Sequence, residues 1–244
     1  GSGPAGRRIA VAAPTLHDRV ADRRTTGVVM CVPYNARMSA YLDRKVAGVA
    51  IIGGGAAGAL AAIQLLRRAE AGTTLVLVEP APGLAQGVAY ATRWPQHLLN
   101  VPAGRMSAFA DAPDDFLDYL MAQAGYADQP REQVASCYAP RMHYAAYLQL
   151  RLQQAQAASA AQLRVIHQRA VALRRTDGVV VVQLDSGARL QACAVVLAVG
   201  NALRPLQAKG AQALSPAQLV QAWDFDAVQA IDPAATVCIV GSGL

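Results

Sequence analysis

The sequence has few aromatic and few charged side chains. Of its 244 residues, 5% are aromatic and 16% are charged, whereas 54% are hydrophobic. This composition excludes a chain that is disordered throughout, because it supplies enough apolar surface for a core. Alanine and valine make up much of the apolar content, which is typical of alanine-rich helices packed on valine-rich strands. We therefore expect an α/β protein with one large domain.

Long apolar runs and paired cysteines are also lacking. No run approaches the roughly 18 apolar residues that indicate a membrane-spanning helix, so we expect a cytoplasmic protein with no membrane partner. The four cysteines show no C-x-x-C spacing, which is typical of thiols in a reducing compartment and argues against a flavin–disulfide reductase. His143 and His167 stand at no metal-ligand spacing from Cys, Asp or Glu, so no metal site is expected.

The positive net charge of +6 is concentrated at the N-terminal end. Residues 1–45 hold eight basic and three acidic side chains, whereas the other 199 residues hold fourteen basic and thirteen acidic ones. The basic residues are not interleaved with aromatic ones, as a nucleic-acid surface would require, so no nucleic acid is expected as a partner. We interpret residues 1–45 as a poorly ordered leader.

A glycine-rich turn follows the first strongly apolar run. Residues 46–52 and 73–78 have the composition of strands buried on both faces, and residues 56–71 have that of a helix closed by Gly72. The turn between the first strand and the helix satisfies G-x-G-x-x-G. A strand, this turn, a helix and a second strand form the unit that binds dinucleotides.

Each glycine of the turn has a physical role in such a unit. Gly53 permits the tight turn, Gly55 lets the backbone approach a pyrophosphate, and Gly58 lets helix and strand pack closely. The phosphates then lie beside the free N–H groups at the helix N-terminus, where Ala56 and Ala57 stand. All five residues are predicted to bind the cofactor, and a glycine-rich turn without a ligand is the alternative interpretation.

Glu79, at the end of the second strand, is the expected partner of the adenosine ribose. It lies 21 residues beyond Gly58, close to the spacing of about 20 in dinucleotide-binding units. Its carboxylate can accept hydrogen bonds from both ribose hydroxyls and would repel a 2′-phosphate, so NADP is not expected at this site. The alternative is a solvated acid at the end of a strand.

Beyond Glu79 the chain departs from a plain NAD-binding domain. Residues 80–112 contain Gly and Pro without a clear period, which is typical of a functional loop. A helix is expected from about Asp111, as its cap, to Ala124, and a second from Arg141 to Ala158. Strands are expected at 163–166, 170–175, 179–184, 188–191, 194–199 and 236–240, with hairpin turns at 177–178 and 185–187.

This layout favours FAD over NAD as the dinucleotide. It resembles flavoproteins with two dinucleotide-binding domains, whose FAD domain carries a small β-meander before a strand that ends in an Ala-Thr-Gly-like turn. Ala198-Val199-Gly200 resembles that turn, with Val in place of Thr. The substitution keeps the glycine and removes a hydroxyl. Ala198 and Gly200 are therefore predicted to contact the cofactor.

Four segments carry a narrower resemblance: 87–90, 97–107, 140–147 and 240–244. Together they resemble the bacterial FAD-NAD(P)-binding family, whose members are mostly uncharacterised oxidoreductases related in architecture to flavin N-monooxygenases. The resemblance covers about residues 46–244. Family members continue with a second glycine motif for NAD(P)H, whose first two glycines match Gly241 and Gly243. We therefore expect this chain to be an N-terminal part of a longer protein.

The resemblance implies a Rossmann-like FAD-binding domain over residues 46–235, with a parallel sheet, a β-meander and inserted helices. It implies that residues 236–244 are the first strand and glycine turn of an NAD(P)-binding domain. The loop 83–107 is then the flavin surround, and the polar side chains in it are predicted to bind the flavin or the pyrophosphate: Asn100, Arg105 and Ser107, with His97 and Arg141 as further candidates. Arg105 would stabilise negative charge on reduced flavin.

These features predict a flavoprotein that uses FAD and, in the full-length protein, NAD(P)H to oxidise or oxygenate an unidentified small molecule. No general acid or base is assigned, because in flavin chemistry the cofactor carries the difficult step. A non-catalytic nucleotide-binding module and an NAD-dependent dehydrogenase are the alternative functions.

Overall fold

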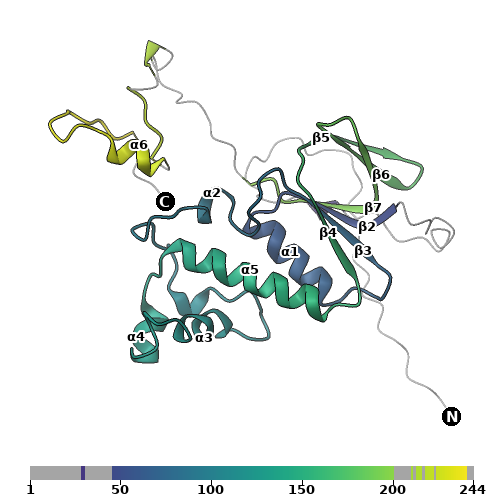
Figure 1. Cartoon of the computed structure of the whole chain (residues 1–244), viewed down its shortest axis with the longest axis horizontal. Coiled ribbons are helices and arrows are strands. Elements are labelled where there is room, and N and C mark those ends of the chain that lie inside the picture. The colour runs from purple at the N-terminus through teal and green to yellow at the C-terminus, as the bar shows by residue number, and fades with distance from the viewer. Residues whose placement is uncertain are drawn as a thin grey trace, which may run out of the picture.

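The computed structural model describes residues 29–30, 46–200, 210, 213–215, 218–222 and 224–240. Its main feature is a mixed sheet with the strand order β4-β3-β2-β7-β6-β5 (Figure 1). The strands are β1 (Val29–Met30), β2 (Val46–Ile52), β3 (Thr74–Val78), β4 (Gln162–Ile166), β5 (Ala170–Thr176), β6 (Val179–Leu184) and β7 (Arg189–Leu197). The helices are α1 (Ala56–Leu66), α2 (Gly87–Tyr90), the 3₁₀-helix η2 (Ala103–Arg105), α3 (Asp115–Met121), α4 (Arg131–Ser136), α5 (Arg141–Ala158) and α6 (Phe225–Gln229).

The parallel half of the sheet has the order of a dinucleotide-binding domain. Strands β4, β3, β2 and β7 run parallel to one another. β2 comes first in the chain among these four, and it has β3 on one side and β7 on the other. The strand order therefore reverses at β2. In open sheets of this kind, ligands bind in the crevice beyond the carboxyl ends of the strands at such a reversal, which here are β2 and β7.

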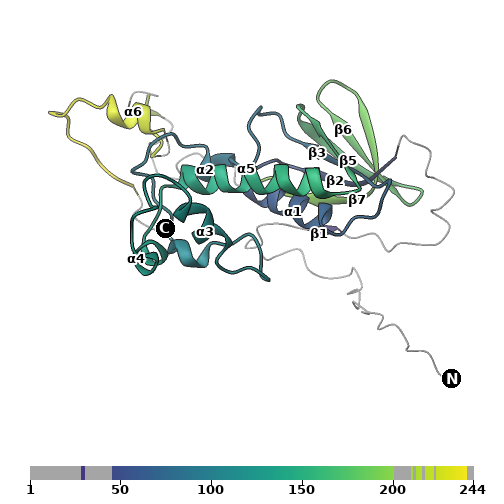
Figure 2. The same ribbon diagram turned by 60° about the horizontal axis from the view of Figure 1, so that its bottom comes forward.

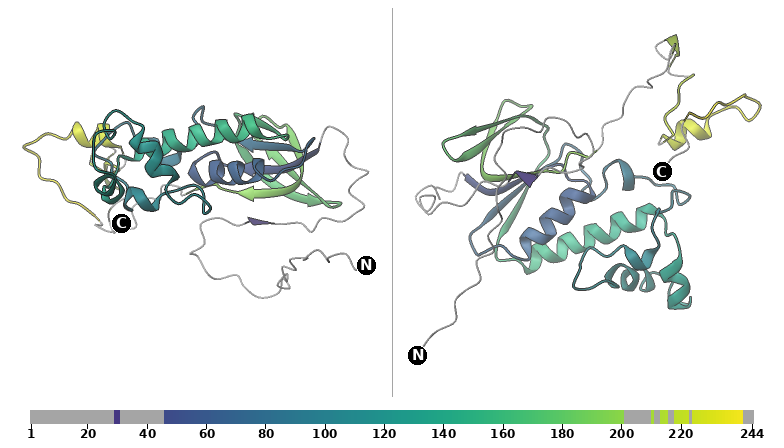
Figure 3. Two further views of the ribbon diagram at one scale, coloured as in Figure 1. Left: turned by 90° about the horizontal axis from the view of Figure 1, so that it is seen from below. Right: turned by 180° about the vertical axis from the view of Figure 1, so that it is seen from behind.

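Two apolar clusters cover opposite faces of this sheet, because successive residues of a strand point to opposite sides. On one face Ile51, Leu75 and Leu77 pack with α1 and α5. On the other face Ala50 and Val76 pack against β6. Figures 1 and 2 show α1 and α5 side by side, and Figure 3 shows α3 and α4 on the side of α5 away from α1. The predicted α/β class with parallel strands and a meander is confirmed.

β7 joins the parallel strands to the meander. Residues 189–192 pair antiparallel with β6, while residues 191–197 pair parallel with β2. The two separate strands predicted at 188–191 and 194–199 are thus one strand, and this prediction was wrong. A single extended segment satisfies both partners, because each edge of a strand offers its own row of hydrogen-bonding groups.

The boundaries of two helices differ from the prediction. α1 ends at Leu66 instead of residue 71, because the N–H of Arg68 bonds to the carbonyl of Leu65 in a tighter turn. α3 begins at Asp115, and Asp111 does not cap it but pairs with Arg67 at 2.7 Å. The predicted helix 141–158 is confirmed as α5, and α4 was not predicted.

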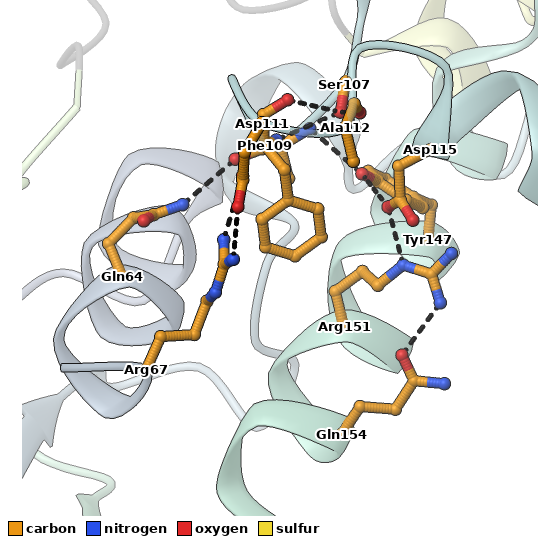
Figure 4. Close-up of polar contacts among 11 residues, drawn as sticks. Gln64, Arg67, Ser107, Phe109, Asp111, Ala112, Asp115, Tyr147, Arg151 and Gln154 are labelled. Carbon is orange, nitrogen blue, oxygen red and sulfur yellow. Dashed lines mark hydrogen bonds and ion pairs between the residues drawn. The ribbon is translucent and has the colours of Figure 1, made fainter. Parts of the chain in front are cut away.

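A network of polar contacts holds the turn at residues 107–115 in place between α1 and α5 (Figure 4). The hydroxyl of the fully buried Tyr147 donates to Asp115 Oδ2 at 2.6 Å and accepts the N–H of Ala108 at 2.9 Å. Arg151 Nε donates to the same carboxylate oxygen at 2.7 Å. From α1, Gln64 donates to the carbonyl of Ala108 at 3.1 Å. The turn therefore has fixed partners on both helices.

The structure differs from two expectations about the chain ends. Val29 and Met30, within the predicted leader, form a short strand antiparallel to β7. Residues 236–240, predicted as a buried strand, form no strand, and the side chain of Ile239 is 83% exposed. A strand requires a hydrogen-bonding neighbour, and no strand in the described part of the chain pairs with this segment. The predicted glycine turn at 241–244 lies outside the described residues.

No helix within the described ranges has the length and apolar character needed to cross a membrane. Those ranges also contain no group of three or more His, Cys, Asp or Glu side chains that could hold a metal ion.

Candidate functional site

The glycine turn lies where β2 ends and α1 begins, and two of its glycines are required by contacts within the protein. Gly53 has a φ of +103°, and a Cβ there would lie 2.2 Å from the carbonyl oxygen of Ala198. A Cβ on Gly58 would lie 1.8 Å from the carbonyl oxygen of Gly53. Both distances are far below van der Waals contact with rigid backbone atoms. These glycines therefore let the ends of β2 and β7 and the first turn of α1 approach one another.

Gly55 differs from these two glycines. It has a φ of −66°, and a Cβ there would meet only Gly87, whose Cα is 3.4 Å away. The protein fold therefore accommodates a Cβ at this position at an ordinary contact distance, so packing alone does not require a glycine here. Close approach of a phosphate group to the backbone would be a further reason for a glycine.

The start of α1 has the electrostatic character of an anion site. No side chain caps the helix, and no acid stands in its first turn. The first N–H groups of any α-helix have no acceptor within the helix, and the helix dipole adds partial positive charge there. Ala57 is exposed, and Ala56 and Gly55 are half-buried. A phosphate would therefore find donors and a favourable potential at this position.

Glu79 stands beside the turn, as predicted from its place at the end of β3. Its Oε2 accepts the N–H of Gly54 at 2.6 Å, and its Oε1 accepts the N–H of Ala81 at 2.9 Å. The carboxylate is therefore held in place by two backbone donors, although each oxygen keeps a second lone pair. Those lone pairs remain available to the two hydroxyls of a ribose.

A second segment, residues 84–87, forms a wall over the glycine turn. The N–H of Ala85 donates to the carbonyl of Gly54 at 2.7 Å, and Leu84 packs on Gly54. Ala85 is fully buried and has a φ of +63°, which is uncommon for a residue with a side chain. No feature of the sequence indicates this conformation, because residues with a Cβ rarely adopt it. The wall brings Gly87 against Gly55.

The end of β7 borders the turn on its other side. Ala198 donates its N–H to the carbonyl of Ile52 at 2.8 Å, which fixes it to the end of β2. Val199 is 70% exposed, and no heavy atom lies within 4 Å of a Cβ built on Gly200, whose φ is +65°. Seven predicted residues from three strand ends and the helix start thus lie together: Gly53, Gly55, Ala56, Ala57, Gly58, Glu79 and Ala198, with the exposed Gly200 two residues further on.

Among the described residues, the three polar residues predicted from the long loop make no hydrogen bond or ion pair with this turn. Asn100 is exposed and follows Leu99, whose N–H bonds to the carbonyl of Ala139 just before α5. Arg105 is exposed in η2 and forms no ion pair within the described residues. Their contacts with a cofactor remain predictions.

Ser107 lies beside the far end of α1. Its neighbour Ala108 bonds to Gln64, nine residues and about 14 Å along the helix axis from Gly55. The Ser107 hydroxyl donates to the carbonyl of Ala112 at 2.6 Å and accepts the N–H of Phe109 at 3.0 Å. The hydroxyl therefore closes the turn in its own loop, and a contact of Ser107 with the cofactor remains a prediction.

His97 and Arg141 connect two parts of the long loop to α5. Arg141 donates from Nε to the carbonyl of Leu98 at 2.8 Å and from its backbone N–H to the carbonyl of His97 at 2.8 Å. His97 Nδ1 lies 2.7 Å from the hydroxyl of Thr92. These contacts hold residues 92–98 against the start of α5, immediately after α2.

Comparison with known proteins identifies a family for this chain. A family model described as FAD-NAD(P)-binding matches residues 50–202. A search of curated proteins finds no match.

Several solved structures are similar over part of their length. A flavin-containing monooxygenase from Stenotrophomonas maltophilia is 22% identical, with a TM-score of 0.39 over 62% of this chain and 37% of that one. A cyclohexanone monooxygenase from Rhodococcus sp. Phi1, bound to NADP⁺, is 20% identical, with a TM-score of 0.45 over 64% of this chain and 26% of that one. This chain thus spans about a quarter to two fifths of the length of these chains.

Proposed function

The chain belongs to the FAD-NAD(P)-binding family, and we propose that it binds FAD, with the pyrophosphate at the start of α1. The observation that carries this proposal is the uncapped helix start at the carboxyl ends of the adjacent parallel strands β2 and β7. Gly55 leaves the approach to that helix start clear, and Glu79 stands at the end of the next strand. This combination suits a diphosphate joined to an adenosine.

The residues of the turn would fit the adenosine diphosphate half of FAD without rearrangement. The N–H groups at the start of α1 would bind the phosphates. Glu79 would accept hydrogen bonds from the ribose hydroxyls, because its carboxylate is already oriented by Gly54 and Ala81. The exposed turn at Val199 and Gly200 leaves room for the cofactor to pass over the end of β7.

FAD would supply the redox chemistry, and the protein would orient the cofactor and shield it from water. We propose that the full-length protein is an oxidoreductase or monooxygenase that takes reducing equivalents from NAD(P)H and acts on a small molecule. The described residues would form the FAD-binding part of such an enzyme. The β-meander that precedes the end of β7 supports FAD over NAD as the ligand.

Titration with FAD and FMN tests this proposal. FMN carries the same isoalloxazine ring but lacks the adenosine monophosphate half. If the pyrophosphate and the ribose provide the binding energy, FAD should bind at least about a hundredfold more tightly, a difference of roughly 2.7 kcal/mol. Quenching of flavin fluorescence measures both affinities.

NAD⁺ serves as the competitor in the same titration. It shares the adenosine diphosphate half, so it should displace FAD only at much higher concentration. A chain that takes up NAD⁺ and no FAD would instead be a dehydrogenase domain. A chain that binds neither dinucleotide would overturn the proposed function.

A further inference from the structure

A hollow of about 320 Å³ lies between the segment that follows α2 and the helix α6. Residue 88 and residues 91–94 form one wall, and residues 224–226 form the other. The two walls are about 130 residues apart in the sequence, and none of the residues of the glycine turn lines the hollow. It is therefore a separate cavity from the proposed cofactor site.

Aromatic rings hold the two walls together. The ring centroids of Trp94 and Phe225 are 4.9 Å apart, and the rings meet edge to face at 63°. Phe225 also meets His97 edge to face, at 4.8 Å and 77°. Aromatic pairs in this geometry attract one another and present further ring faces and edges to a third ring. The apolar part of the hollow is thus suited to a planar aromatic ligand.

Charged groups at the hollow leave an excess of negative charge. Arg93 pairs with Asp226 at 2.5 Å and lies over the ring of Trp94, with its guanidinium carbon 5.3 Å from the ring centroid. Asp224 has no basic partner among the described residues, and its Oδ1 accepts the N–H of Ala227 at the start of α6. One carboxylate is therefore in excess, which disfavours an anionic ligand.

The hollow adjoins the wall of the proposed cofactor site. Val88, which lines it, directly follows Gly87, and a Cβ on Gly87 would lie 3.3 Å from Gly55 Cα. Val88 is 57% exposed. A molecule in the hollow would therefore lie beside α2, whose first residue contacts the glycine turn.

We propose that this hollow binds a small aromatic molecule without negative charge, by contact with Trp94 and Phe225. Its volume is at the lower end of the range of about 300–1,000 Å³ for small-molecule sites, so the ligand has one or two rings. The proposal names the substrate class of the flavoprotein proposed above and rests on that function for the reaction alone. The binding step is testable without FAD.

Trp94 provides the signal for the test, because it is one of two tryptophans in the chain. Replacing the other, Trp223→Phe, leaves Trp94 as the sole tryptophan reporter. Benzamide and benzoate are matched probes of equal size, one neutral and one anionic. We expect benzamide to change the Trp94 fluorescence in a saturable manner, with a Kd at least about tenfold lower than that of benzoate.

Two further variants identify the place of binding. In the same background, Phe225→Ala removes one aromatic wall and should abolish the saturable change. Val171→Ala, at an exposed position of β5, should preserve it. Circular dichroism checks that each variant is folded. The proposal is overturned if benzamide gives no saturable change, if benzoate binds equally well, or if Phe225→Ala still binds.

The outcome is independent of the cofactor proposal, because no FAD is present in this titration. Benzamide binding together with failure to bind FAD would contradict the proposed function and leave the hollow as a ligand site. FAD binding without benzamide binding would contradict only the substrate class.

Discussion

Gly58→Ala is expected to remove measurable FAD binding and to lower the free energy of unfolding by about 1–3 kcal/mol. The added Cβ would lie 1.8 Å from the carbonyl oxygen of Gly53. Because that oxygen belongs to the backbone of the turn, α1 must move away from β2 to relieve the clash. The displacement takes the helix N-terminus away from the phosphate position. Thermal unfolding and FAD titration measure the two effects.

Gly125→Ala is the matched control, because a Cβ there meets no heavy atom within 4 Å and its φ is not positive. This variant should change stability by no more than about 0.5 kcal/mol and should bind FAD like the native chain. Native stability and native FAD affinity in Gly58→Ala would contradict the close packing of α1 on the end of β2.

Tyr147→Phe is expected to lower stability at neutral pH by about 1–3 kcal/mol. The substitution removes one hydroxyl and keeps the buried ring. It leaves the N–H of Ala108 without its acceptor, and the Asp115 carboxylate loses a donor at 2.6 Å. Urea unfolding of the two proteins measures the difference. Tyr138→Phe is the control, because the side chain of Tyr138 is 51% exposed.

The same variant should also change the response to alkaline pH. Burial raises the pKa of Tyr147 from about 10 to about 12, and the hydrogen bond to Asp115 adds to the shift. Between these values the unfolded chain has lost the proton and the folded chain has kept it, so stability falls as pH rises. Each unit of pKa corresponds to about 1.4 kcal/mol.

Native protein should therefore lose stability between about pH 10 and 12, and Tyr147→Phe should lose about 1–3 kcal/mol less over that interval. Part of the loss should persist in the variant, because burial also raises the pKa of Tyr144. Equal losses in both proteins would show that Tyr147 is not held in the protonated form by the network.

The sequence was sufficient to predict the dinucleotide-binding unit because its signals are local. The strand at 46–52 and the turn at 53–58 carry their own composition and spacing. Glu79 follows from the length of one helix and one strand. The structure brings these elements together with the end of β7, because the parallel pairing of β2 with β3 and β7 aligns the three strand ends.

The parts that could not be predicted depend on contacts between distant residues. Asp111, predicted to cap the next helix, instead pairs with Arg67, 44 positions earlier in the chain. The hydroxyl of Ser107, predicted to contact the cofactor, bonds to Ala112 and Phe109 in its own loop, and the sequence does not indicate these partners. The buried, positive-φ Ala85 has no sequence signature at all. Such features follow from tertiary packing, which a linear pattern does not encode.

FAD titration of the native chain and of Gly55→Ala tests the central claim most directly. A Cβ on Gly55 makes only an ordinary contact within the protein, at 3.4 Å from Gly87 Cα, but the pyrophosphate proposed at the start of α1 would approach this backbone closely. We predict unchanged stability, within about 0.5 kcal/mol, and an FAD affinity at least about tenfold weaker. Native FAD affinity in a stably folded Gly55→Ala chain would contradict the placement of the pyrophosphate at the start of α1.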